Sequence, residues 1–193
     1  MGTTANRAIP YPDASEPIGL ANEHQQDLAE WLDDELIRSR VYLEFGNLGQ
    51  DIPNTNTDTV VGVGSSGTLE GGWTFDAGNN RWAYSGPDAL FLVSCQLVFN
   101  VTATKGTLGM FVRGGGHPSI GGFDPLFGDT SLVTDFGHRI VVQASDVVAC
   151  GPSHYDTLDI RAKASLSGLS GTVALDGGDF GGNRFTATRL RGL

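Results

Sequence analysis

Apolar residues alternate with polar ones along most of the chain after residue 40, as they do in strands that bury one face. The clearest run is residues 157–166, where every second side chain is apolar and those between are polar or charged. Residues 90–101 show the same period, and their apolar face consists of Phe91, Val93, Cys95, Leu97, Phe99 and Val101. The pattern predicts a mainly β domain, a jelly-roll β sandwich of about eight to ten antiparallel strands.

Aromatic pairs on both sides of a polar turn predict a hairpin within this domain. Trp73 and Phe75 precede residues 76–80 (DAGNN), and Trp82 and Tyr84 follow them. Asp, Gly and Asn between alternating runs are typical of a hairpin turn. The four aromatic residues either face the core or form a platform on which a sugar stacks, and their spacing of two favours the core.

The segment before residue 41 follows a different pattern. Residues 10–17 hold three prolines, which fix φ and favour an extended arm. A stripe of apolar residues at three- and four-residue spacing then predicts one short α-helix over about residues 20–39. The stripe consists of Leu28, Trp31, Leu32 and Leu36. Such a helix is not stable alone in water, so its stripe must pack on another chain or on the next domain. We therefore divide the chain into an arm and helix, residues 1–40, and a jelly-roll domain, residues 41–193.

Charge and hydropathy exclude several classes of protein. With 12 Lys and Arg against 22 Asp and Glu, the chain has a formal net charge of -10 and a pI of about 4.6. Nucleic-acid binding through clustered basic residues is therefore not expected. No run of about 18 apolar residues is present, so we expect no membrane insertion. The first residues lack a basic segment followed by an apolar one, so we expect no signal peptide and synthesis in a cytoplasm.

The longest irregular stretch is expected over residues 114–128, which are rich in glycine. Long irregular segments on a rigid scaffold often carry binding residues, so this stretch is predicted to be an exposed ligand loop. Its candidate ligand residues are His117, Phe123, Asp124 and Phe127.

The other motifs do not indicate a catalytic or cofactor site. Residues 62–67 (GVGSSG) fit a dinucleotide fingerprint, but turn and strand residues follow them instead of a helix, so we interpret them as a turn. The histidines lack metal-ligand spacing, and no nucleophile motif is present.

Residues 176–183 (DGGDFGGN) are either a hairpin turn or a Ca²⁺ loop. Cys95 and Cys150 are either free and buried or joined in a disulfide. We therefore expect no enzyme activity and no cofactor.

Residues 7–36 resemble the opening of minor tail and fibre-type virion proteins of phages that infect actinobacteria. In that family an arm of the form Pro-Tyr-Pro … Asp-Pro-Val precedes a helix of the form Gln-Ala-Leu-Ala-x-x-Ile/Val-Asp. Here residues 10–12 are Pro-Tyr-Pro and residues 16–18 are Glu-Pro-Ile. Residues 26–33 (QDLAEWLD) stand in the place of the helix motif.

The remainder of the chain resembles the jelly roll of complement-type globular heads and tumour-necrosis-factor-like trimers, which also ends phage head fibres and tail appendages. Residues 88–94 (DALFLVS) match its long strand after an aromatic hairpin, and residues 183–190 (NRFTATRL) match its last Phe-x-x-x-x-Leu strand. Residues 140–148 (IVVQASDVV) stand where that family has a Leu-x-x-Gly-Asp-x-Val turn, with Ser145 in place of the glycine.

These resemblances imply a trimeric structural protein of a phage virion: a minor tail protein or tail appendage, a head fibre or a capsid decoration. Residues 1–40 would attach it to capsid or tail proteins and to its own copies. The candidate contacts are Ile9, Tyr11, Leu28, Trp31, Leu32 and Leu36. The jelly roll would face outward from the virion and adhere to host surface carbohydrate through three-fold display.

Two other functions stay open. A polysaccharide-degrading enzyme on a β sandwich would need two acidic residues that converge in a cleft, with Asp124, Asp129 and Asp135 as candidates. A cellular complement-like or cytokine-like binding module would need no such pair.

Overall fold

The computed structural model describes residues 2–3, 10–11, 40–45, 50–64, 67–103, 105–119, 122–133, 139–176 and 182–193. The chain divides into two units, residues 1–39 and 40–193. In the first unit, β1 (Gly2–Thr3) pairs with β2 (Pro10–Tyr11) in antiparallel register. The extended geometry of Pro10 and Tyr11 agrees with the arm expected there. The helix expected over residues 20–39 lies outside the described residues.

The second unit consists of strands joined by turns, within the residues that the structure describes. These strands are β3 (Arg40–Phe45), β4 (Asp51–Ile52), β5 (Thr59–Val60), β6 (Thr68–Leu69), β7 (Trp73–Asp76), β8 (Arg81–Tyr84), β9 (Ala89–Asn100), β10 (Lys105–Gly115), β11 (Phe123–Val133), β12 (Arg139–Cys150), β13 (Thr157–Ser167), β14 (Val173–Leu175) and β15 (Asn183–Gly192). All pairings between them are antiparallel.

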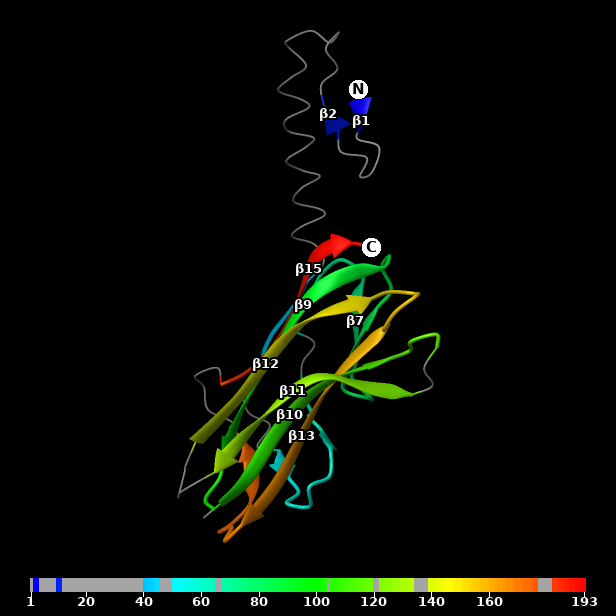
Figure 1. The fold of residues 1–193 in the computed structure, drawn as a ribbon. Coiled ribbons are helices and arrows are strands. Elements are labelled where there is room, and N and C mark those ends of the chain that lie inside the picture. Colours follow the sequence, from blue (N-terminus) through cyan, green and yellow to red (C-terminus); the bar gives the residue numbers. More distant parts are fainter. Residues whose placement is uncertain are drawn as a thin grey trace. The chain divides into compact units, whose positions relative to one another are not determined.

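The strands form two sheets, which we call the β10 sheet and the β9 sheet (Figure 1). In the β10 sheet the order is β11-β10-β13-β8-β7, and β5 also pairs with β13. In the β9 sheet, β12 pairs with one edge of β9, while β15 and β14 pair with the other edge. Beyond them, β15 pairs with β3 and β3 with β6, while β14 pairs with β4.

The chain crosses repeatedly between the two sheets. From β9 it passes to β10 and β11 in the other sheet, returns as β12, crosses again as β13, and comes back as β14 and β15. Antiparallel strands that alternate in this way between two packed sheets are a jelly roll. The predicted β-sandwich fold class is therefore confirmed.

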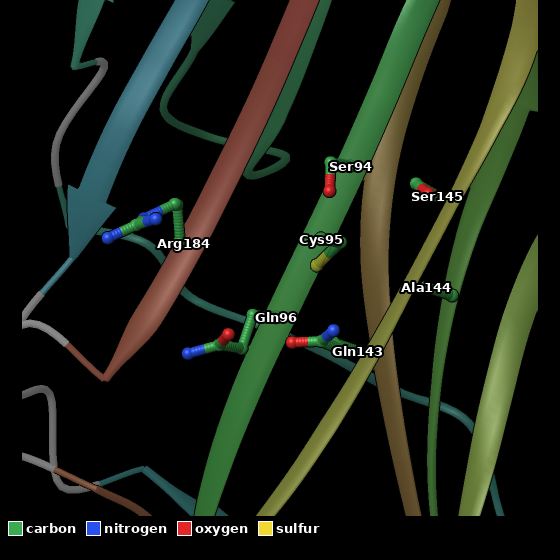
Figure 2. A pocket seen from close by; sticks show the side chains of 7 residues that line it. All are labelled: Ser94, Cys95, Gln96, Gln143, Ala144, Ser145 and Arg184. Atoms are coloured by element: carbon green, nitrogen blue, oxygen red, sulfur yellow. The ribbon is translucent and has the colours of Figure 1, made fainter.

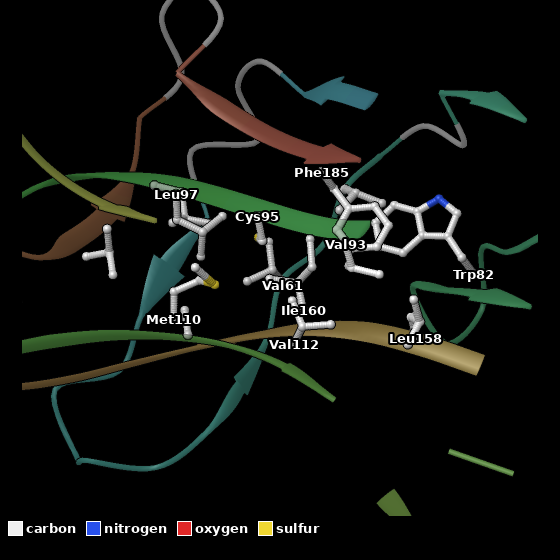
Figure 3. Close-up of a cluster of buried hydrophobic side chains, with 14 of the residues drawn as sticks. Val61, Trp82, Val93, Cys95, Leu97, Met110, Val112, Leu158, Ile160 and Phe185 are labelled. Carbon is white, nitrogen blue, oxygen red and sulfur yellow. The ribbon is translucent and has the colours of Figure 1, made fainter. Parts of the chain in front are cut away.

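The core lies between the sheets, and the period of two decides which residues fill it. Residues 91, 93, 95, 97 and 99 of β9 and residues 158, 160, 162 and 164 of β13 are all buried, as the alternation predicts. In Figure 3, Leu97 and Phe185 from the β9 sheet point toward Met110 and Ile160 from the β10 sheet. Burial of this apolar surface drives the association of the two sheets.

The predicted aromatic hairpin is confirmed. β7 and β8 pair with Trp73 opposite Tyr84 and Phe75 opposite Trp82. Trp73, Trp82 and Tyr84 are buried, and Trp82 stacks on Phe185 with ring centroids 4.1 Å apart and ring planes 14° apart. The aromatic set therefore packs in the core and does not form a surface platform.

The irregular stretch expected over residues 114–128 is mostly strand, which corrects the prediction. β10 runs through Gly115 and β11 begins at Phe123. The glycines here leave room for neighbouring groups, because a Cβ on Gly115 would lie 2.6 Å from the Phe123 ring. A Cβ on Gly128 would lie 2.4 Å from the carbonyl oxygen of Met110. These glycines mark close contact between strands, a use of glycine that sequence alone does not separate from a loop.

The resemblance of residues 140–148 to a Leu-x-x-Gly-Asp-x-Val turn does not extend to a turn in this chain. β12 passes through Ser145 and Asp146, which pair with Ser94 and Val93 of β9. Serine lacks the freedom of glycine to adopt positive φ, and β9 supplies a partner for each residue of β12. The continuous ladder is therefore the favoured local structure.

The two cysteines are free and buried, so the disulfide alternative is wrong. Cys95 lies on β9 and Cys150 ends β12. Burial raises the pKa of the Cys150 thiol to about 12 and raises the pKa of the Cys95 thiol further. Both thiols therefore stay protonated at neutral pH and act as small apolar side chains.

Replacing Gly128 with alanine is expected to destabilise the fold by about 1–3 kcal/mol, because the added Cβ overlaps a backbone oxygen of the neighbouring strand. The matched control is Gly78→Ala in the β7–β8 turn, where the nearest atom to an added Cβ is 3.4 Å away. We expect Gly78→Ala to be neutral or slightly stabilising, since it lowers the entropy of the unfolded chain. Urea denaturation measures both free energies of unfolding. Equal stability of the two variants would contradict the close strand contact at Gly128.

Candidate functional site

The face of the β9 sheet that points away from the core is the first candidate site. On β9, Leu92, Ser94 and Gln96 alternate with the buried residues and therefore point outward. The register places Val147, Ser145 and Gln143 of β12 directly opposite them. On the other side of β9, Thr188, Thr186 and Arg184 of β15 lie opposite the same three residues.

Apolar side chains on this face are unusually exposed. Leu92 and Val147 lie opposite each other and are 43% and 49% exposed. Val141 on β12 and Tyr42 on β3 are exposed to a similar extent, as is Leu190 on β15. Several half-exposed apolar side chains on one face of a sheet, here interspersed with serine, threonine and glutamine, indicate a place where another molecule binds. We call the outward face of β12, β9, β15 and β3 the apolar face.

A shallow hollow of about 290 Å³ lies in the middle of this face. The register pairs Gln96 of β9 with Gln143 of β12, and Ser94 with Ser145. In Figure 2 the Gln143 side chain extends toward β9, whereas the Gln96 side chain extends toward β15. Arg184 of β15 closes one side, and Gln96 donates a hydrogen bond from Nε2 to the Gly182 carbonyl at 2.7 Å. The outward positions of β9, β12 and β15 hold no acidic residue, although the chain carries a net charge of -10. On β3, Glu44 occupies an outward position opposite Arg184 of β15.

The outward face of the β10 sheet is charged instead. Asp159 of β13 is 1% exposed, and two arginines flank it. Arg113 donates hydrogen bonds to its two carboxylate oxygens at 3.0 and 2.9 Å, and Arg161 donates to the same oxygens at 3.2 and 2.9 Å. Burial by itself would raise the pKa of the Asp159 carboxyl, but the arginine hydrogen bonds and charges outweigh it and hold the pKa below its ordinary value.

The candidate ligand residues do not form one loop. His117 lies in the connection after β10, where its Nδ1 accepts a hydrogen bond from the Ser119 N–H at 3.2 Å. Asp124 lies in β11 and accepts a hydrogen bond from the Tyr155 hydroxyl at 3.2 Å. The His117 ring lies 5.2 Å from the Tyr155 ring, so Tyr155 joins these two candidates. Burial and Asp124 raise the pKa of Tyr155.

The two phenylalanines among these candidates differ in exposure. Phe123 is 38% exposed at the start of β11, and the guanidinium carbon of Arg113 lies 4.9 Å from its ring centroid. Phe127 is partly buried and packs against the core, so its assignment to an exposed loop is wrong. The strand pairing of β11 with β10 explains this, because it continues past Phe127.

The candidate attachment residues are not tested by the structure. Tyr11 lies in β2, opposite Gly2, and its side chain is outside the described part of the molecule. The other candidates also lie outside the described residues, namely Ile9, Leu28, Trp31, Leu32 and Leu36.

The described residues offer no metal centre. Among them no group of three or more His, Cys, Asp or Glu side chains could hold a metal ion. Residues 177–181, most of the loop considered for Ca²⁺, are not among the residues that the structure describes. The carboxylate of Asp176, at the start of this loop, accepts a hydrogen bond from Asn100 and forms an ion pair with Arg139. Within the same residues, no helix is long and apolar enough to cross a membrane.

The apolar face was missed at the level of sequence, although a signal for it exists. β9 and β12 carry apolar residues at both alternating positions. Half of their outward positions are apolar, namely Leu90, Leu92, Val98, Val141, Val147 and Ala149. A strand with one wet face does not need those residues. Apolar residues at both positions therefore indicate that the second face is also covered.

Comparison with known proteins identifies the fold. No protein-family model and no curated protein matches the chain. The solved structure of Eiger TNF from S. frugiperda is similar over 81% of this chain and 94% of its own, with 11% sequence identity and a TM-score of 0.56. Murine APRIL at pH 8.5 is similar over 79% of this chain and 99% of its own, with 16% identity and a TM-score of 0.52. At these identities the likeness establishes a tumour-necrosis-factor-like jelly roll and nothing about activity.

Replacing Asp159 with asparagine is expected to destabilise the chain by about 2–4 kcal/mol at pH 7, because two arginines lose their shared carboxylate. The folded-state pKa is lowered, so this stabilisation is present above the unfolded pKa near 3.8 and is lost as the pH falls through the lower folded pKa. The stability difference between wild type and Asp159→Asn should therefore shrink below pH 3.8. Denaturant titrations across this pH range measure it. A difference that is constant with pH would refute a charged Asp159.

Proposed function

We propose that this chain is a non-catalytic structural protein of a phage virion, in which three copies of the jelly roll associate and are displayed outward. The observation that carries the proposal is the apolar face, where Leu92 and Val147 are about half exposed in a single copy. Covering such side chains contributes about 25 cal/mol per Å² of apolar area removed from water.

Charge favours other copies of the chain as the occupants of this face. Copies that each carry a net charge of -10 repel one another, so they associate best through a surface without carboxylates. The outward positions of β9, β12 and β15 are such a surface, with hydroxyl and amide groups such as Ser94 and Gln143 between the apolar side chains. In a ring of three copies each copy contacts both of its neighbours, so no contact surface is left uncovered for further polymerisation.

Residues 1–40 would attach the trimer to capsid or tail proteins. This part of the proposal is supported by the proline-rich arm, by the apolar stripe from Leu28 to Leu36 and by the resemblance of residues 7–36 to phage tail and fibre proteins. The outward jelly rolls would adhere to host surface carbohydrate, since three linked sites convert weak single contacts into stable attachment.

A second candidate function is a cellular binding module of the cytokine type. The likeness to Eiger TNF and APRIL favours it. Both functions use the same fold, so location separates them. If the chain is a virion protein, mass spectrometry of purified phage particles should detect it as a stoichiometric component, and its absence from particles would favour the cellular module.

Sedimentation velocity of the full chain should give three times the chain mass of 20.3 kDa. The double variant Leu92→Asp, Val147→Asp places carboxylates in the proposed contact and should lower the association constant by about a hundredfold or more. Its far-ultraviolet circular dichroism should stay unchanged, because both side chains point away from the core. The control is Thr130→Asp, an exposed position on β11 of the β10 sheet. A monomeric wild type, or a double variant that still sediments as a trimer, would contradict the proposed assembly.

A further inference from the structure

A recess of about 270 Å³ lies on the charged face of the β10 sheet, away from the apolar face. Its walls come from segments far apart in the sequence: the β7–β8 turn with Asn79 and Asn80, the start of β11 with Phe123, and the middle of β13 with Arg161. Three types of side chain therefore converge on it, namely amide, aromatic ring and guanidinium.

The turn that forms one wall is held in place by Asp76. Its carboxylate accepts hydrogen bonds from the backbone N–H of Asn79 at 3.2 Å, from Nδ2 of Asn79 at 2.7 Å and from Nε of Arg81 at 3.1 Å. Asn80 lies in the left-handed region with a φ of 51°, and its Oδ1 accepts a hydrogen bond from the Val63 N–H at 3.3 Å. These hydrogen bonds involve neither the side-chain oxygen Oδ1 of Asn79 nor the side-chain nitrogen Nδ2 of Asn80. A ligand would meet these groups already oriented, which lowers the entropy lost on binding.

The floor is the Asp159 network. Arg161 binds the carboxylate through Nε and Nη2, so its Nη1 group takes no part in that bidentate pair. Because the carboxylate fixes the guanidinium plane, the donors of Arg161 have a defined direction. Arg81, at the edge of the recess, is held by a single contact from its Nε to Asp76 Oδ2 at 3.1 Å.

Phe123 supplies an apolar surface next to these polar groups. Its ring lies over Gly115, where a Cβ would approach to 2.6 Å, and the Arg113 guanidinium lies 4.9 Å from its centroid. The ring is still 38% exposed. The glycine opposite therefore lets the ring lie across the sheet instead of being pushed off it.

From this geometry we infer that the recess binds one saccharide unit of a glycan. A pyranose ring has adjacent hydroxyls that pair with planar amide and guanidinium groups, and an apolar face that packs on an aromatic ring. A free anion fits less well, because Arg81 is paired with Asp76, and Arg113 and Arg161 share Asp159. The volume suits a single sugar unit, below the range of larger ligand pockets. This inference rests on the adhesive role proposed above and assigns that role to a site.

Saturation-transfer difference NMR on the full chain tests the inference. The probes are the methyl glycosides of glucose, galactose, mannose, rhamnose and N-acetylglucosamine at millimolar concentration, with inorganic phosphate as a separate probe. We expect at least one glycoside to bind wild type. Phe123→Ala should weaken that binding about tenfold or more, since the stacking surface is lost. Phe123→Tyr keeps the ring and should retain binding, and Lys163→Ala, on the same sheet face but outside the recess, should not change it.

Each outcome decides the question. If no glycoside binds wild type, or if phosphate alone binds, the saccharide assignment is overturned. If a glycoside binds Phe123→Ala as tightly as wild type, the sugar lies elsewhere and the recess is not the site. Sedimentation of the same samples separates these results from a failure of the trimer, because the recess and the apolar face lie on different sheets.

Discussion

A sheet has two faces, and packing two sheets against each other buries only one face of each. In this chain the buried faces are set by the alternation along β9 and β13, which places Phe99 and Ile160 among the core residues. The outward residues of the same strands must then face water or another molecule. Their polarity decides which of these occurs, and so the functional surfaces of the chain follow from its core.

The two sheets differ in the polarity of the face that the core leaves unburied. The apolar face presents half-exposed side chains such as Leu92 and Val147, which gain free energy when another copy covers them. On the β10 sheet the charges of Arg113, Asp159 and Arg161 are already paired within one copy, so they need no second copy to neutralise them. Assembly through the first face and display of the second is therefore the division that the chemistry favours.

The alternation of residues 157–166 and the aromatic hairpin were sufficient to predict a jelly roll, because burial of one face per strand is a local pattern. The glycines of residues 114–128, such as Gly128, led to the incorrect prediction of a loop. A glycine that makes room for a neighbouring strand cannot be distinguished in the sequence from a glycine in a loop. The recess could not be predicted, because Asn79, Phe123 and Arg161 meet only through the pairing of distant strands. The apolar face was predictable in principle from the excess of apolar residues on β12. The helix and the attachment residues before residue 40 stay predictions.

Hydroxyl-radical footprinting of the assembled full chain measures whether the apolar face is covered by other copies. In a single copy Leu92, Val147 and Phe123 are exposed to similar extents, 43%, 49% and 38%. If the apolar face joins copies of the chain, Leu92 and Val147 should be strongly protected from oxidation. Phe123 should be oxidised at the rate of a freely exposed side chain. Oxidation of Leu92 and Val147 at the rates of freely exposed side chains would contradict the account.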